Sequence, residues 1–183
     1  IAINAFGQSS VDWQSIIAIV AILSIGVGNF SALWQNQPNR MMAYSSVAQT
    51  GFLLIGIAAM SINGVHFLMF YSSVFLVANF LCFLYLQQFE LDYNTSTVQG
   101  FGGLGLRSVL ASVFLLAGLI SLTGLPPMAG FTSKLLIFTS LWEAYNQSDK
   151  TILLVLFVFG LINTVIALFF YLKIPFYLFF KTS

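Results

Sequence analysis

One lysine inside a strongly apolar stretch is the residue of this chain best suited to chemistry. Lys134 follows the double proline of residues 124–130 (GLPPMAG), and residues 135–141 after it are almost all apolar. At about 1.5 Å per helical residue, it lies about 12 Å from Trp142, the nearest aromatic residue suited to a membrane interface. A charge at that depth costs about 2.5–3.5 kcal/mol on the scale derived from membrane insertion, so an ionisable residue there indicates function.

The chemistry open to such a lysine is proton transfer. Burial in a medium of low dielectric disfavours the charged form, so a buried lysine can take up and release a proton that a solvated lysine holds. The alternative interpretation is a structural lysine neutralised by a carboxylate on a neighbour. We predict that Lys134 carries protons, because a break in the helix lies directly before it.

The composition is that of a polytopic membrane protein. Of the 183 residues, 59% are hydrophobic and 6% are charged, and the mean hydropathy is +0.96. A soluble domain carries about 25% charged residues, so this chain has too few charges to cover a soluble surface. The net charge of +1, with no basic run, gives no indication of nucleic-acid binding.

Cysteine and histidine are too few for cofactor chemistry within the chain. The sequence has one cysteine, Cys82, and one histidine, His66. These exclude a disulfide framework, a zinc site or a bis-histidine haem built by the chain alone. We expect any redox cofactor to sit on a partner subunit.

Six apolar segments predict an all-α, polytopic transmembrane helical bundle. A span needs about 20 apolar residues, and one passage here is divided into two halves. Residues 90–105, with four glycines, predict an aqueous loop. The chain begins without methionine and ends just after an apolar helix, so we expect it to be a piece of a longer or split polypeptide. The predicted helices run over residues 11–33, 41–60, 65–87, 107–123, 131–145 and 152–180.

The segments on either side of the double proline form either two crossings or two halves of one. As two crossings, they would place Arg40, Arg107 and Lys150 on one side together with four of the five carboxylates. As one broken helix, they would gather Arg40, Arg107, Lys173 and Lys181 on one side, opposite Lys150. The second arrangement agrees with the excess of basic residues on the cytoplasmic side of membrane proteins, and we predict it.

The break itself has a mechanical meaning. Pro126 and Pro127 remove two amide donors, and glycines such as Gly130 relax the backbone. Irregular backbone at membrane depth is tolerated only where it is buried in protein or lines a wet cavity. The ends of half-helices present free carbonyls and amides there to an ion or a charged side chain. The alternative is an ordinary tight hairpin between two helices.

Polar residues gather at the start of the segment 41–60. Ser45, Ser46, Gln49 and Thr50 lie on roughly one face of its first turns, where they either join helices by hydrogen bonds or hold water beside a proton path. Arg40, just before them, is a candidate interfacial anchor and a candidate element of the path.

Further candidates lie near the ends of the other segments. His66 titrates near neutral pH and is either interfacial or a proton relay. Lys173, two residues before Pro175, can snorkel to the membrane surface and form the exit of the same path. Asn79 and Asn163 are predicted to form hydrogen bonds between helices.

Four runs of residues, in matching order and spacing, carry a family resemblance. Residues 27–33 (VGNFSAL) resemble V-G-N-x-x-A-L, and residues 41–52 (MMAYSSVAQTGF) resemble L-A-Y-S-S-I-x-H-x-G-Y. Residues 121–134 (SLTGLPPMAGFTSK) resemble S-L-x-G-x-P-P-x-x-G-F-x-x-K, and Asn163 with residues 170–173 (FYLK) resembles N-S-x-x-x-x-Y-Y-Y-L-R. These motifs are typical of the antiporter-like membrane subunits of respiratory complex I, and together they cover nearly the whole chain.

The resemblance implies a specific architecture and activity. Members contain two inverted five-helix repeats, each with one broken helix that bears a proton-carrying residue, and this chain resembles the second repeat with Lys134 as that residue. The first repeat and the last helix of the family are absent from the sequence. NADH, flavin, iron–sulfur clusters and quinone would be bound by partner subunits, and none by this chain. The expected location is a bacterial or mitochondrial inner membrane, beside an adjacent antiporter-like subunit and in contact with the lipid bilayer.

Two positions depart from the family pattern, and two rival functions follow from the same fold. Asn39 stands where bacterial members usually have lysine, and Gln49 stands where a histidine is frequent, so neither position is assigned a titrating role. One rival is a subunit of a multisubunit cation/proton antiporter. The other is a structural subunit that only tethers pump modules, in which case Lys134 is replaceable.

Overall fold

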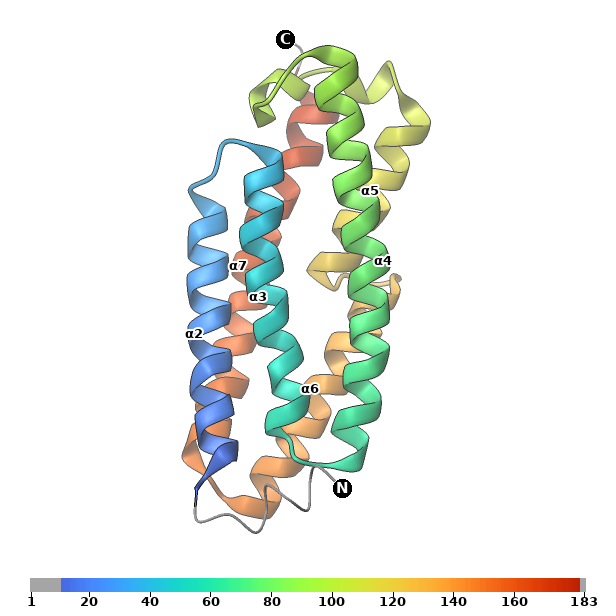
Figure 1. The fold of residues 1–183 in the computed structure, drawn as a ribbon. Coiled ribbons are helices and arrows are strands. Elements are labelled where there is room, and N and C mark those ends of the chain that lie inside the picture. Colours follow the sequence, from blue (N-terminus) through green and yellow to red (C-terminus); the bar gives the residue numbers. More distant parts are fainter. Residues whose placement is uncertain (1–10, 182–183) are drawn as a thin grey trace.

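The structure, a computed structural model, describes residues 11–181, which form a bundle of helices (Figure 1). Four helices run along the bundle, and each is long and apolar enough to cross a membrane. They are α2 (Trp13–Leu33), α3 (Pro38–Ala58), α4 (Ile62–Tyr93) and α7 (Thr151–Phe180). The prediction of an all-α polytopic bundle is confirmed.

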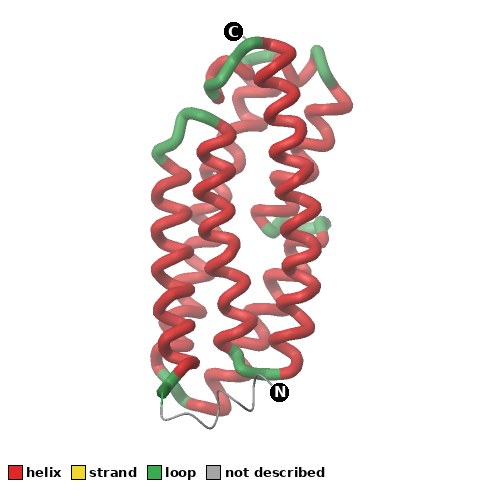
Figure 2. Tube along the Cα trace, viewed as in Figure 1, coloured by secondary structure: helices red, strands yellow, loops and turns green. Residues whose placement is uncertain are grey.

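The remaining passage is a broken helix. It consists of α5 (Val109–Thr123) and α6 (Ala129–Ser148). Figure 1 shows α5 running from the end of the bundle where α7 finishes to about mid-height, and α6 continuing to the opposite end. Figure 2 shows the loop between them at mid-height, beside the long helices. With 15 residues, α5 rises only about 22 Å, less than the hydrocarbon thickness of about 30 Å. The structure therefore has one broken passage and not a hairpin of two full crossings.

Basic residues gather at one end of the bundle, which we call the Lys181 end because Lys181 follows α7 there. Arg40 lies in the first turn of α3, and Arg107 lies two residues before the start of α5. Lys173 joins them, since its Nζ donates to the Gln35 carbonyl in the α2–α3 connection at 3.0 Å. This grouping is the one predicted for a broken helix.

The opposite end, which we call the Asp12 end, carries an ion pair. Lys150, between α6 and α7, lies with its Nζ 2.6 Å from Oδ1 of Asp12, the residue that caps α2. The pair joins the start of α2 to the start of α7 at the surface of the bundle.

Helix α4 and the loop after it differ from the sequence prediction. The helix begins at Ile62, because the Ser61 side chain accepts from the Gly64 amide at 2.9 Å, and it ends at Tyr93, six residues beyond the predicted end. Asn94 stops it in the left-handed conformation with φ 49°. The prediction of an aqueous loop over residues 90–105 is therefore wrong for residues 90–93, which belong to the helix.

The rest of that loop is also more ordered than predicted. It holds two short 3-10 helices, η1 (Val98–Phe101) and η2 (Leu104–Leu106). Val98, Phe101 and Leu104 are buried in the apolar core at this end of the bundle, where η1 and η2 contact α7. Their burial favours an ordered cover over an open loop.

The other helix bounds differ by a few residues. Helix α3 begins three residues early because Pro38 fits the first helical position, where no amide donor is needed. The broken passage begins at Val109 in place of residue 107, and its second half runs from Ala129 to Ser148 in place of 131–145.

Side-chain amides connect the helices, as predicted for Asn79 and Asn163. Nδ2 of Asn29 in α2 donates to the carbonyl oxygen of Asn163 in α7 at 3.1 Å and to its Oδ1 at 3.2 Å. Ser46 Oγ in α3 donates to Asn79 Oδ1 in α4 at 3.3 Å. Such bonds fix the rotation of each helix, since a slipped helix would leave a buried amide unpaired.

Candidate functional site

Lys134 lies in the second turn of α6, and its side chain is 5% exposed. Its Nζ donates to the carbonyl oxygens of Leu122 at 3.0 Å and Thr123 at 3.1 Å, in the last turn of α5. In an uninterrupted helix these carbonyls would accept from the amides of residues 126 and 127. Both of those residues are proline and have no amide hydrogen. The double proline therefore leaves open the two acceptors that the lysine uses.

Two glycines allow the lysine and the broken ends to approach. Gly124 ends α5 with φ 81°, and a Cβ there would lie 2.8 Å from Cδ of Lys134. A Cβ on Gly130 would lie 1.7 Å from the Ser121 carbonyl oxygen. The start of α6 therefore rests directly on the backbone of α5, and neither position has room for a side chain.

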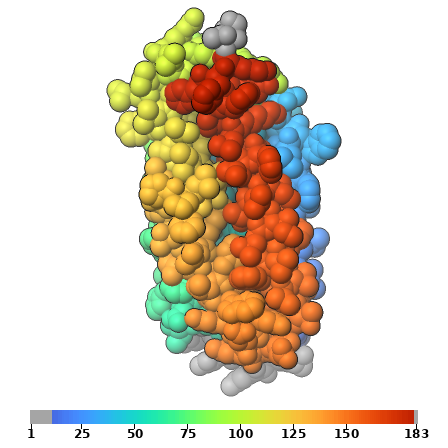
Figure 3. Space-filling view, turned by 180° about the vertical axis from the view of Figure 1, so that it is seen from behind, coloured from blue at the N-terminus to red at the C-terminus, as the bar shows by residue number. Residues whose placement is uncertain are grey.

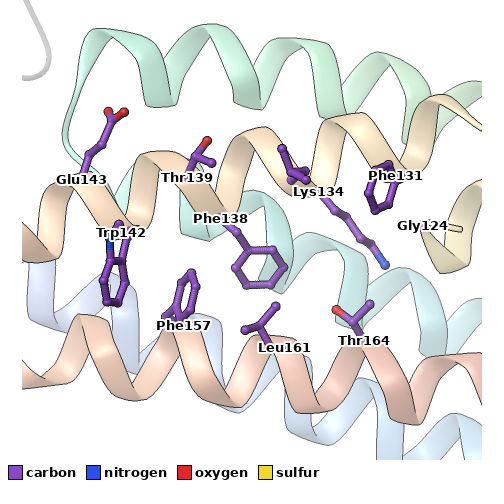
Figure 4. Close-up of a pocket in the computed structure, with 11 residues that line it drawn as sticks. Gly124, Phe131, Lys134, Phe138, Thr139, Trp142, Glu143, Phe157, Leu161 and Thr164 are labelled. Carbon is purple, nitrogen blue, oxygen red and sulfur yellow. The ribbon is translucent and has the colours of Figure 1, made fainter. Parts of the chain in front are cut away.

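The groups around the Lys134 amine are neutral: two backbone carbonyls and an aromatic ring. Among residues 11–181 the only ion pair joins Asp12 and Lys150, so no described carboxylate neutralises Lys134. Glu143 lies nine residues further along α6, about 13 Å away by helical rise, and Figure 4 shows it pointing away from Lys134. The Phe52 ring lies with its centroid 4.8 Å from Nζ, a favourable position for a cation. Within the described part of the chain, Lys134 is therefore not a structural lysine paired with a carboxylate.

A cavity opens beside the lysine, between α6 and α7. Its volume is about 640 Å³, and Figure 3 shows the surface hollowed between these two helices. In Figure 4 the Lys134 side chain extends toward Gly124 and Thr164 at one edge of the cavity. The cavity is otherwise lined mainly by apolar side chains, among them Phe131, Leu135, Phe138, Trp142, Phe157 and Leu161.

A buried hydrogen-bond network meets Lys134 from the other side. Gln49 Nε2 in α3 donates to the Leu122 carbonyl at 3.0 Å, so Gln49 and Lys134 share this acceptor. The same Nε2 donates to the hydroxyl of Tyr171 in α7 at 3.2 Å, and the hydroxyl of Tyr71 in α4 donates to Gln49 Oε1. The two tyrosines were not predicted as site residues. The signal available in the sequence is a tyrosine inside an apolar span, because a buried hydroxyl usually needs a partner.

The polar residues predicted to share one face of α3 have different hydrogen-bond partners. Ser45 is buried and donates to the Met42 carbonyl of its own helix at 2.7 Å. Ser46 bonds Asn79, away from Lys134. Thr50 is exposed and donates to the Val47 carbonyl of its own helix at 2.7 Å, so it does not share the buried face.

Three of the predicted path residues lie apart from Lys134. Arg40 is exposed at the Lys181 end, and Lys173 is held there by the Gln35 carbonyl. His66 is exposed in the first turns of α4, toward the Asp12 end. The structure gathers Lys134 with Pro126, Pro127 and Gly130, and it gives Arg40, His66 and Lys173 no direct contact with that centre.

Comparison with known proteins identifies the family of the chain. Residues 1–167 match the family described as NADH:quinone oxidoreductase/Mrp antiporter, TM. The chain is 39% identical over 163 residues to NAD(P)H-quinone oxidoreductase subunit 2, chloroplastic, from Mesostigma viride, covering 89% of the chain and 31% of that protein. It is 33% identical over 172 residues to NADH-quinone oxidoreductase subunit N 2 from Chloroherpeton thalassium, covering 94% of the chain and 33% of the relative. The chain therefore spans about a third of the length of these relatives.

Solved structures show the same fold. A chain of respiratory complex I from Thermus thermophilus superposes with a TM-score of 0.74 at 26% identity, covering 92% of this chain and 36% of that one. A chain of the Mrp complex from Dietzia sp. DQ12-45-1b superposes with a TM-score of 0.84 at 23% identity, covering 94% and 31%. The second likeness concerns the fold alone.

Proposed function

The chain belongs to the NADH:quinone oxidoreductase/Mrp antiporter transmembrane family, and we propose that it is part of a proton-translocating membrane subunit of complex I, subunit N (subunit 2). It corresponds to the second five-helix inverted repeat of that subunit, and it resides in an energy-transducing membrane. Its partners are the remainder of the same subunit, the adjacent antiporter-like subunit and other membrane subunits of the complex.

A single observation carries the proposal. Lys134 is buried at the break between two half-helices, bound by two carbonyls that the double proline leaves without amide donors. A lysine solvated by neutral dipoles and lacking a fixed counter-ion can exist with or without its proton, whereas a strong buried ion pair would lock it as a cation. The geometry therefore suits a site that is alternately protonated and neutral.

Residues of this chain explain how Lys134 can exist in both the protonated and the neutral state. In the charged state, the Leu122 and Thr123 carbonyls and the Phe52 ring stabilise the ammonium. In the neutral state the lysine loses most of this stabilisation, and its side chain is free to turn toward the cavity between α6 and α7. NADH oxidation and quinone reduction occur at flavin, iron–sulfur and quinone sites on partner subunits. Arg40, His66 and Lys173 are proposed as outer elements of uptake or release.

Two alternatives make different predictions. A subunit of a multisubunit cation/proton antiporter would share the fold, as the likeness to the Mrp complex indicates, but it would not copurify with peripheral redox subunits. A structural tether would leave Lys134 without a role in transport. The sequence identity to quinone oxidoreductase subunits, 33–39% for the two relatives above, favours complex I.

The decisive experiment measures proton pumping by inverted membrane vesicles that carry the assembled complex with Lys134→Ala. We expect pumping to be lost while assembly persists, because no other described side chain can bind a proton at the break. NADH:quinone turnover is recorded in the same vesicles, and Lys181→Ala, at the surface of the bundle, is the matched control. Normal pumping and turnover in Lys134→Ala would contradict the proposal and favour the tether.

A further inference from the structure

A buried, non-titrating side chain shares an acceptor with Lys134. The Leu122 carbonyl receives Lys134 Nζ at 3.0 Å and Gln49 Nε2 at 3.0 Å. A carbonyl oxygen has two lone pairs, so both donors can be bound together. Proline at residue 126 removes the amide that would otherwise bind this oxygen, and Gln49 is therefore its one donor that does not titrate.

Two tyrosines determine which way the Gln49 amide points. Its Oε1 accepts from the Tyr71 hydroxyl, and its Nε2 donates to the Tyr171 hydroxyl as well as to Leu122. Both amide hydrogens and the amide oxygen thus have partners. The three side chains come from α4, α7 and α3, and each is 3% exposed or less. Flipping the amide would set its oxygen against the Leu122 carbonyl oxygen, which this arrangement excludes.

The surroundings of Gln49 leave little space for another conformation. The cavity that Gln49 and Tyr71 line, with Ser121 and Leu122, has a volume of about 10 Å³, which is close to that of one water-sized sphere. On the other side of Lys134 the cavity is about 640 Å³. Lys134 can therefore move on the α6–α7 side, while Gln49 is confined.

We propose that Gln49, oriented by Tyr71 and Tyr171, is the positioning residue of the Lys134 site. When Lys134 is neutral and has turned away, Gln49 remains hydrogen-bonded to the Leu122 carbonyl and holds it in position. The same carbonyl is then ready to accept from the ammonium when Lys134 is protonated and turns back. Without Gln49, the neutral state leaves a buried carbonyl unpaired at the frayed end of α5, which is costly. This role rests on the proposed function of Lys134 as the proton carrier.

The test compares variants of Gln49 in the assembled complex, in inverted vesicles, with proton pumping and NADH:quinone turnover measured together. Gln49→Leu keeps a side chain of similar size and removes both hydrogen-bonding roles, and we expect pumping to fall about tenfold. Gln49→His restores one donor and one acceptor, and we expect it to pump within about twofold of the wild type. If Gln49 merely filled space, both variants should pump close to the wild-type level, because leucine and histidine are both similar in size to glutamine.

Tyr71→Phe provides a second, milder variant that conserves the packing. It frees Gln49 Oε1, so pumping should fall by several-fold, and in the double variant with Gln49→Leu the loss should not exceed that of Gln49→Leu alone, since the two residues act as one unit. Tyr85→Phe is the control: Tyr85 lies on the same helix and stacks on Phe114 at 5.7 Å, outside the network. Normal pumping in Gln49→Leu, or additive losses in the double variant, would overturn the positioning role. If Lys134→Ala itself pumps normally, the proposed function fails as well, and the two failures are thus distinguished.

Discussion

Replacing Gly124 by alanine tests whether the glycine at the end of α5 makes room for the Lys134 side chain. Gly124 has φ 81°, a conformation that costs an ordinary residue about 1–2 kcal/mol. The added Cβ would also lie 2.8 Å from Cδ of Lys134, whereas ordinary contacts begin at 3.4 Å. To restore an ordinary contact, the lysine stem must therefore move by about 0.6 Å, the difference between these two distances.

That displacement is large compared with the tolerance of the hydrogen bonds. The Nζ of Lys134 lies 3.0 and 3.1 Å from its two acceptors, and an N–H···O bond is already long at about 3.2 Å. At least one of the two bonds is expected to be lost, and a hydrogen bond to a charged group contributes about 1.5–3 kcal/mol. Proton pumping by Gly124→Ala should accordingly fall by about 10- to 100-fold.

The matched control is Gly103→Ala. Gly103 has the same left-handed backbone, with φ 72°, but it lies between η1 and η2 at the Lys181 end, away from Lys134. Both variants should lower the thermal stability of the complex, because both strain a left-handed backbone position, while only Gly124→Ala should impair pumping in inverted vesicles. Equal pumping by the two variants would refute the conclusion that Gly124 makes room for the lysine.

Two further predictions concern contacts outside the site. The hydrogen bonds from Lys150 and then Ser15 lower the pKa of Asp12 to about 2, so the stabilisation by the pair is present above pH 3.8 and is lost as the pH falls toward 2. Since the pair is exposed it contributes under about 1 kcal/mol, and Lys150→Met should return the carboxyl titration, followed by infrared spectroscopy, toward 3.8. Asn29→Leu or Asn163→Leu should each destabilise the bundle by about 0.5–1.5 kcal/mol in thermal denaturation, because each removes the buried hydrogen bond between the two side-chain amides. The double replacement should cost less than the sum of the two, and simple additivity would show that the amides are not coupled.

Local chemistry explains why much of the fold could be predicted. Apolar runs of membrane-spanning length predicted the long helices, and the arrangement of basic residues correctly favoured a broken passage over a hairpin. The extent of α4 was missed because Glu90 and Asp92 read as loop residues, although an amphipathic end of a helix carries such charges readily. The burial of Val98 and Phe101 was missed as well, because it depends on contacts with α7, which is distant in sequence.

By itself, the sequence determined the class of the protein, the position of the break, and the presence of a lysine beside it. These depend on neighbouring residues: two prolines remove two amide donors wherever the helix lies. Only the tertiary structure decided that the same two carbonyls receive Lys134, and that Gln49, Tyr71 and Tyr171 meet there. The reason is that Gln49 and Tyr171 are 122 residues apart in sequence, and such contacts depend on how the helices are rotated and packed. No local pattern reports that rotation.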